Sequence, residues 1–186
     1  MSRVLPSVRQ RLRDERGFTL IELLTAIALL GIVIGALATV LMAATRAEDD
    51  LNRRFGAQIN ARLALDQLRR EIHCASSVTP TGASSSITIV LGNRCPSAAG
   101  GATVTWCTSG SGTRYALYRA PGSTCSTSVK KAADFLTTGQ VFTFTPQSAS
   151  SLATLSVTLP VNPKPGSGLP DYRLQDDIVL RNSTRA

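Results

Sequence analysis

Residues that usually carry catalysis are few in this chain of 186 residues, which contains one histidine and four cysteines. His73 lies directly before Cys74. Adjacent residues on a helix point about 100° apart, so these two side chains would not face each other as a thiol–imidazole pair. No other acid, base and nucleophile converge in the sequence. We therefore expect no enzyme activity and no bound cofactor.

Three aspartates near the C-terminus could supply hard oxygen ligands to a calcium ion. They are Asp171, Asp176 and Asp177. Their spacing matches no defined calcium-binding loop, so the favoured interpretation is a solvated turn. We predict no metal site.

The four cysteines, Cys74, Cys95, Cys107 and Cys125, are separated by 21, 12 and 18 positions. These spacings contain no C-x-x-C pair, which argues against a zinc site. An even number of cysteines in an exported region favours two disulfides. Three connectivities are possible, and pairing Cys74 with Cys95 and Cys107 with Cys125 closes the shortest loops.

Export is indicated by the segment 18–44, which holds one ionisable group and no proline in 27 residues. At about 1.5 Å per residue it is long enough to cross a hydrocarbon core of about 30 Å. Residues 1–17 carry five arginines and two acids, whereas Arg46 and three acids follow the segment. This charge difference predicts a single-pass protein of the cytoplasmic membrane with its N-terminus in the cytoplasm.

A cleaved secretory signal peptide is the alternative interpretation of this segment. Its apolar core would run only about 7 to 15 residues and end at a small-residue cleavage site. The apolar run here is about twice that length, and Ala43-Ala44-Thr45 is a poor cleavage site. A membrane-spanning helix in contact with lipid is therefore expected.

Glu22 is the only ionisable residue of the apolar run. A carboxylate in a bilayer costs on the order of 2.5–3.5 kcal/mol at the centre, so it usually has a partner and a function. The sequence Arg16-Gly17-Phe18-Thr19-Leu20-Ile21-Glu22 resembles the processing signature of type IV pilins and of the pseudopilins of type II secretion systems.

The resemblance implies that a prepilin peptidase removes residues 1–17 by cutting after Gly17 and then methylates the amine of Phe18. Glu22 then becomes the fifth residue of the mature chain. Cleavage creates a charged amine, and Glu22 of a neighbouring subunit can lie beside it if the helices are staggered. Opposite charges attract strongly at low dielectric, so we expect Glu22 to be an assembly residue.

Gly31 and Gly35 form a G-x-x-x-G pair within the span. Small residues let helices approach closely, but each glycine also weakens a helix interior by about 1 kcal/mol. Helix packing and local helix melting are both open, and the resemblance favours them equally.

The segment 45–76 continues the helix as an amphipathic extension. Charged residues such as Glu71 are expected on other faces of this helix. The apolar residues are expected to form one stripe facing a sheet: Leu51, Phe55, Ile59, Leu63, Leu65, Leu68 and Ile72. The stretch 62–72 also resembles that of J-type minor pseudopilins.

Residues 77–186 switch to a period of two with many turn residues, which predicts an exported β-rich head. Strands are expected at 86–91, 102–107, 113–119, 140–145, 152–160 and 177–181, with a hairpin loop at 108–112 and a loop at 163–168. The predicted fold is α+β, with a long N-terminal helix, first membrane-spanning and then amphipathic, packed on a C-terminal antiparallel sheet.

The resemblance implies a structural subunit of a pilus-like assembly, most like a J-type minor pseudopilin of a type II secretion system. Its partners would be prepilin peptidase, other pilin-like subunits and the inner-membrane assembly machinery. A minor pilin of a type IV pilus, acting in adhesion or DNA uptake, is the alternative. The head carries nine basic and four acidic residues, but only Lys130 and Lys131 are adjacent, so we expect no nucleic-acid partner.

Overall fold

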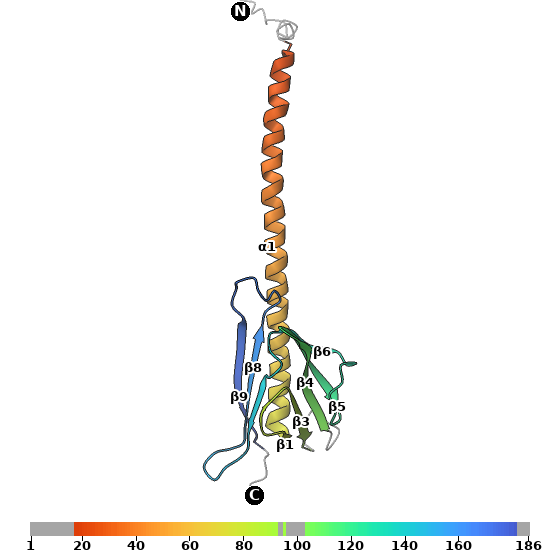
Figure 1. The fold of residues 1–186 in the computed structure, drawn as a ribbon, viewed down its shortest axis with the longest axis vertical. Helices are drawn as coiled ribbons and strands as arrows, with labels where there is room; N and C mark the ends of the chain where they lie inside the picture. The colour runs from red at the N-terminus through yellow and green to blue at the C-terminus, as the bar shows by residue number, and fades with distance from the viewer. Residues whose placement is uncertain (1–16, 93–94, 96–102, 182–186) are drawn as a thin grey trace, which may run out of the picture. The chain divides into compact units, whose positions relative to one another are not determined.

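The computed structural model describes residues 17–92, 95 and 103–181. In these ranges one helix, α1 (Leu20–Cys74), precedes nine strands (Figure 1). The strands are β1 (Ala75–Thr79), β2 (Gly82–Ser84), β3 (Ser86–Leu91), β4 (Thr103–Ser111), β5 (Arg114–Pro121), β6 (Lys131–Leu136), β7 (Phe142–Thr145), β8 (Thr154–Val161) and β9 (Tyr172–Val179). The predicted leader, except Gly17, lies outside the described residues. The chain divides into two units, 1–49 and 50–186, and each is described by itself.

The first unit contains the apolar part of α1. By length and composition, α1 is the one helix among the described residues that could cross a membrane. Its large apolar side chains are exposed, as a lipid-facing or subunit-facing helix requires. Gly31 and Gly35 lie within the continuous helix, and a Cβ built on either glycine would meet open space.

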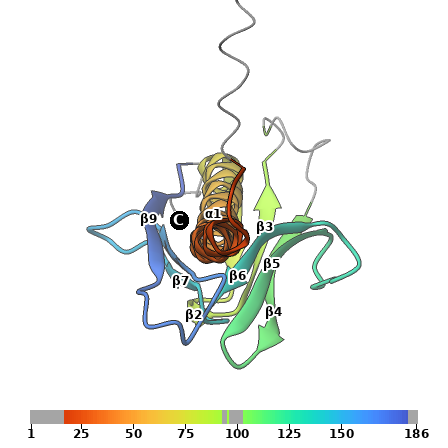
Figure 2. The same ribbon diagram turned by 90° about the horizontal axis from the view of Figure 1, so that it is seen from above.

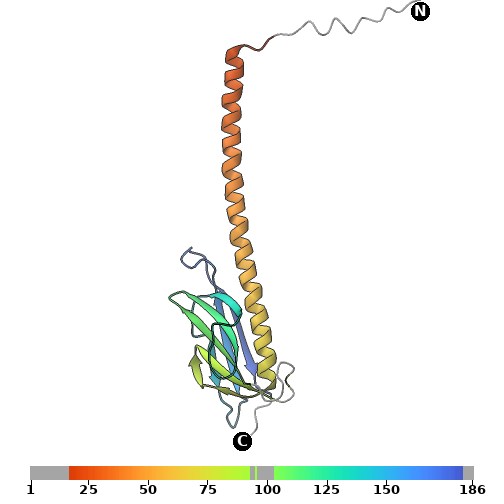
Figure 3. The ribbon, with the colours of Figure 1, turned by 90° about the vertical axis from the view of Figure 1, so that its right-hand side faces the viewer.

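The second unit is a curved antiparallel sheet that lies on one side of the C-terminal part of α1 (Figures 2 and 3). The strand order is β1-β3-β4-β5-β6-β8-β7-β2, and β9 pairs with β8. The predicted α+β class is confirmed. The order joins two antiparallel groups through a single pairing of β6 with β8, at Leu136 and Val161.

The end of α1 is fixed against β3. The backbone N–H of Gly92 donates a 3.1 Å hydrogen bond to the carbonyl oxygen of Cys74, the last helical residue. This contact satisfies one of the carbonyl groups that a helix end leaves unpaired. A Cβ at position 92 would lie 2.8 Å from that oxygen, which explains the glycine.

The core between α1 and the sheet is built from small helical residues and large sheet residues. The helix buries seven side chains: Ala57, Ala61, Ala64, Leu65, Leu68, Glu71 and Ile72. Among the residues that the sheet contributes are Trp106, Phe142 and Leu155, and each of these three is at most 1% exposed. The alanines allow the strands to approach the helix backbone closely, and the sheet supplies the bulk.

The expected apolar stripe is wrong over its first half. Leu51, Phe55, Ile59 and Leu63 are 66, 65, 40 and 61% exposed. A repeat of four residues rotates about 40° per step around a helix, so this row turns away from a sheet that contacts the alanine face. The second half, from Leu65 to Ile72, is buried as expected.

The expected strands agree with the sheet in part. The strand at 86–91 is confirmed with its predicted bounds. The predicted hairpin is confirmed, but its loop is shorter than 108–112, because β4 and β5 continue their pairing to Ser111 and Arg114. The tight turn beyond that pair contains Gly112, which adopts a φ of 60°. Strands β1, β2 and β6 were not predicted, and β9 begins five residues earlier than expected, because their small and polar residues give little alternation of hydrophobicity.

Candidate functional site

The N-terminal end of α1 holds the residues that the sequence singled out first. Gly17 and Phe18 precede the helix, and both are exposed. Thr19 is the residue before the first helical position, Leu20. Glu22 lies in the first turn, where a negative charge interacts favourably with the helix dipole.

Thr19 and Glu22 cap the helix reciprocally. The Thr19 backbone N–H donates to Oε2 of Glu22, and the Glu22 backbone N–H donates to Oγ1 of Thr19, both at 3.4 Å. This is the capping-box pattern, in which a threonine is followed three residues later by a glutamate. The Glu22 carboxylate is thus held beside the backbone of Thr19, one residue from the expected amine of Phe18. The sequence interpretation missed Thr19, although the T-x-x-E pattern could have identified it.

A second candidate surface lies on α1 in unit 50–186. We call Leu51, Phe55, Ile59 and Leu63 the outer apolar row. Three of its four side chains are more than 60% exposed, although the alanines of the same helix are buried. Soluble proteins rarely leave contiguous large apolar side chains in water unless the surface contacts a partner or a membrane.

The buried face of the same helix carries one charge. Glu71 is 1% exposed and accepts hydrogen bonds from Trp106 Nε1 at 2.8 Å and Arg119 Nε at 2.7 Å. Gln67 adds a longer contact of 3.4 Å. A buried carboxylate needs such partners, because its desolvation is otherwise costly. Glu71 therefore joins α1 to β4 and β5. Its expected position, on a helix face turned away from the sheet, is wrong.

Polar contacts also join α1 to β9. Arg62 donates to the Tyr172 hydroxyl through Nη2 at 2.6 Å, and Arg69 pairs with Asp176 at 2.8 Å. One turn farther, His73 Nδ1 lies 3.1 Å from the carbonyl oxygen of Val179. His73 and Cys74 therefore have separate contacts, His73 with the Val179 carbonyl oxygen and Cys74 with Cys95 through a disulfide.

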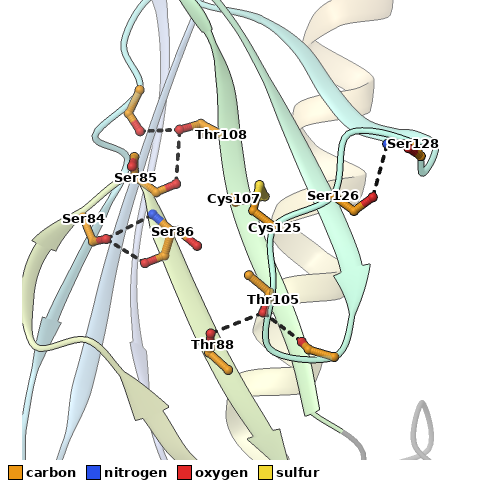
Figure 4. The surroundings of a disulfide bond; sticks show 12 residues. Ser84, Ser85, Ser86, Thr88, Thr105, Cys107, Thr108, Cys125, Ser126 and Ser128 are labelled. Carbon is orange, nitrogen blue, oxygen red and sulfur yellow. Dashed lines mark hydrogen bonds between the residues drawn. A yellow bond between two sulfur atoms is a disulfide. The ribbon is translucent and has the colours of Figure 1, made fainter.

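Two disulfides stabilise the head, and their pairing is the one that closes the shortest loops. Cys74 bonds Cys95 with a Cα–Cα distance of 5.4 Å, and Cys107 bonds Cys125 at 5.8 Å. The first joins the end of α1 to the segment after β3. The second joins β4 to the segment that follows β5 (Figure 4). Close by, the Thr105 hydroxyl donates a 2.8 Å hydrogen bond to the Gly122 carbonyl of the same segment.

The three C-terminal aspartates have separate partners. Asp171 accepts hydrogen bonds from Thr137 and Asn162, which lower the pKa of its carboxyl group. Asp176 pairs with Arg69, and Asp177 accepts a hydrogen bond from Ser156. Across the described ranges, no three metal-ligating side chains converge.

The two adjacent lysines of the head differ in their surroundings. Lys131 pairs with Asp134 at 2.8 Å, and this hydrogen bond raises the pKa of the Lys131 ammonium group. Both lysines are exposed. One of the two charges is therefore already matched within the chain.

Residues 12–38 match the family model described as the prokaryotic N-terminal methylation motif. The matched segment includes the Gly17–Phe18 junction, the Thr19–Glu22 cap and both glycines of the apolar helix. No curated protein and no solved structure matches the chain. The similarity to known proteins thus lies in the junction and the apolar helix.

Proposed function

We propose that this chain, a pilin-like subunit by its N-terminal methylation motif, is a non-catalytic minor pseudopilin of a type II secretion-like system. The motif is the observation that carries the proposal, since it implies processing by prepilin peptidase and assembly with other pilin-like subunits. The J-type assignment is supported by the resemblance of residues 62–72.

Processing would begin at the cytoplasmic end of the apolar helix. Prepilin peptidase would cut between Gly17 and Phe18 and methylate the Phe18 amine. The arginines of the leader keep that end in the cytoplasm before cleavage. After cleavage, the mature chain begins with a cationic amine directly before the Thr19–Glu22 cap.

Assembly would use the charge of Glu22. Among the described residues, the side-chain contacts of this carboxylate are long ones, to Thr19. An amine from a neighbouring subunit would form a stronger, charge-assisted hydrogen bond with it in the membrane. The pairing would set the axial register of one subunit against the next.

The outer apolar row would extend the subunit contact beyond the membrane. Its side chains are long, apolar and spaced by one helical turn, which suits packing against an apolar helix of another subunit. The head would present this row without any change in its own core, because the row makes no part of that core. Secretion would then depend on how subunits pack, with no reaction at this chain.

Mass analysis of the mature N-terminus tests the proposal. We expect the membrane-bound protein to start at a methylated Phe18 in cells with prepilin peptidase and to keep its leader without the peptidase. Replacing Gly17 by a bulky residue should block cleavage, whereas the same replacement at Gly56 should not. An intact leader in the mature protein would contradict the proposal.

Deletion of the gene separates the two pilin-like roles. If the chain is a minor pseudopilin, release of secreted proteins requires it. The deletion should then leave the exported proteins on the periplasmic side of the outer membrane. A deletion that preserves secretion but abolishes surface pili, adhesion or DNA uptake would instead identify a minor pilin.

A further inference from the structure

A small pocket lies within unit 50–186, between α1 and the chain that leads from β8 into β9. Its volume is about 260 Å³. Seven residues line it: Arg54, Gln58, Val161, Pro163, Pro170, Asp171 and Tyr172. The volume is below the usual range for cofactor sites, about 300–1,000 Å³, and suits a single side chain.

Arg54 lines the pocket and carries an unpaired hydrogen-bond donor. Its Nε donates to Asp50 at 2.9 Å, which holds the guanidinium group from one side. Its Nη2 is buried and has no hydrogen-bond acceptor among the described residues. Buried donors are nearly always paired, and an arginine prefers a carboxylate as a partner.

The charges around the pocket are mainly positive. Of the charged residues, Arg54 and Asp171 line the pocket. Near it, Arg53, Arg54 and Lys164 act on Asp50 and Arg173 acts on Asp171, each favouring the ionised carboxylate. The hydrogen bond from Arg54 and the nearby cations lower the pKa of Asp50. Both carboxylates already have donors, Arg54 for Asp50 and Thr137 with Asn162 for Asp171. The surplus positive charge therefore favours an additional anion.

The walls of the pocket restrict which anion fits. Pro163, Pro170 and the Tyr172 ring offer apolar surface. The Tyr172 hydroxyl is held by Arg62, whose guanidinium also lies 5.7 Å from the ring centroid. Apolar walls beside the unpaired donor of Arg54 match the methylenes and single charge of a glutamate or aspartate. A phosphate headgroup would bring more oxygens than this donor can pair.

We propose that this pocket binds a carboxylate side chain of a neighbouring pilin-like subunit, with Arg54 as the donor. The proposal rests on the proposed function, because it takes assembly with other subunits as given. It adds a polar contact of defined chemistry on the head, separate from Glu22 and from the outer apolar row.

The binding chemistry can be tested on the isolated full-length chain in neutral detergent micelles. The ¹⁵N resonance of Arg54 Nε is followed while N-acetylglutamate N-methylamide is added at constant ionic strength. We expect a saturable shift in the millimolar range. The matched probe, N-acetylglutamine N-methylamide, should bind at least about tenfold more weakly, because it lacks the charge.

Variants locate the effect. In the variants the resonances of Tyr172, which also lines the pocket, are followed instead. Arg54→Gln should abolish their shift, and Arg54→Lys should retain a weakened one. Arg70→Gln should bind within about twofold of the parent, because Arg70 is exposed and does not line the pocket. No saturable shift, or equal binding of both probes, would overturn the proposal. A shift produced only by phosphatidylglycerol in the micelles would overturn it in favour of a lipid site.

A second experiment uses assembled subunits in cells. A photoreactive amino acid at Gln58 should cross-link to a peptide of another pilin-like subunit that contains Asp or Glu. Arg54→Gln should reduce the yield, whereas Arg70→Gln should not. Unchanged yield in Arg54→Gln would overturn the proposal.

If the chain never assembles, the proposed function fails but the micelle titration still measures the pocket. If assembly occurs and the titration is negative, only the pocket proposal fails.

Discussion

Arg119 on β5 donates a 2.7 Å hydrogen bond from Nε to the carboxylate of Glu71, a helical residue that is only 1% exposed. Trp106 on β4 donates to the other oxygen of the same carboxylate at 2.8 Å. One buried charge thereby connects the helix to two neighbouring strands. Its partners are specific in position and direction, so the contact fixes how the helix sits on the sheet.

Glu71→Ala should destabilise the head by about 2–4 kcal/mol. The substitution leaves the Trp106 N–H and the partly buried Arg119 cation without their acceptor, and loss of one partner from a buried pair is costly. Trp106 is the only tryptophan of the chain, so its fluorescence during urea unfolding of the full chain in micelles measures the loss. Asp66→Ala, on an exposed part of the helix, should change stability by less than about 0.5 kcal/mol. Equal stability of both variants would show that Glu71 does not anchor the helix.

The sequence predicted the class of fold but placed Glu71 wrongly. Periodicity identifies large apolar residues, and it therefore selected Leu51 to Leu63 and ignored Ala57, Ala61 and Ala64. Alanine carries little hydrophobic signal, yet it allows the closest approach of a sheet. A charged residue is read as solvated unless its partners are known, and Trp106 and Arg119 lie 35 and 48 positions away.

Ala61→Leu should destabilise the head, whereas Phe55→Ala should not. Ala61 is fully buried against the sheet, so three added carbons must displace packed atoms at a cost of about 1–3 kcal/mol. Phe55 is 65% exposed, and its truncation should change stability by less than about 0.5 kcal/mol. The same fluorescence-monitored unfolding measures both variants.

The exposed residue should matter for assembly instead. In cells with the companion subunits, Phe55→Ala should lower the amount of this chain that co-purifies with them, because the outer apolar row loses its largest side chain. Asn60→Ala is a matched control on an exposed position of the same helix. A Phe55→Ala chain that is unstable but assembles normally would contradict the division between core face and outer row.

Removal of the Cys107–Cys125 disulfide should cost about 2–4 kcal/mol. The bond closes a loop of 18 positions, and such a cross-link restricts the unfolded chain. Cys107→Ala combined with Cys125→Ser leaves no free thiol from this pair, and alanine suits the buried position 107. Urea unfolding without reductant measures the loss. A change below about 0.5 kcal/mol would mean that the hydrogen bond from Thr105 to Gly122 alone holds the segment.

Asp171 should contribute stability that is lost in acid. Hydrogen bonds from Thr137 and Asn162 lower its folded pKa, so the folded state binds this proton less readily than the unfolded chain. The contribution is therefore present above the unfolded pKa, about 3.9, and declines as pH falls through the folded pKa. Thr137→Val should raise the pKa of Asp171 and reduce this loss.

Carboxyl ¹³C titration of the full chain measures the pKa directly. The control is Asp50 in the same variant, whose lowered pKa depends first on its hydrogen bond from Arg54. Thr137→Val should leave the Asp50 titration unchanged. If the Asp171 titration is also unchanged, the hydrogen bond from Thr137 is not the cause of the lowered pKa.

The candidate site was predictable to different degrees along the chain. Gly17, Phe18 and Glu22 form a local pattern, which can be recognised without a fold. The Arg54 pocket was not predictable, because Arg54 and Asp171 meet only when the chain between β8 and β9 folds beside α1. The capping role of Thr19 was predictable from the T-x-x-E pattern, whereas the charge of Glu22 by itself predicts only a role in assembly.

Glu22→Gln separates the two roles of that side chain. Glutamine can replace glutamate in a capping box, so the variant should keep the start of α1, insert in the membrane and be cleaved after Gly17. It lacks the negative charge that would pair with the amine of a neighbouring Phe18, and at low dielectric a neutral partner is a much weaker one. We therefore expect processed but unassembled protein, measured by N-terminal mass and by co-purification with companion subunits.

Thr19→Ala provides the reverse change, because it removes the cap and leaves the charge. It should cost the helix end about 1 kcal/mol while preserving most assembly. Normal assembly of Glu22→Gln together with failure of Thr19→Ala would show that Glu22 acts through the cap. Failure of Glu22→Gln alone would assign its main role to charge pairing between subunits, because the two variants differ in whether the cap or the charge remains.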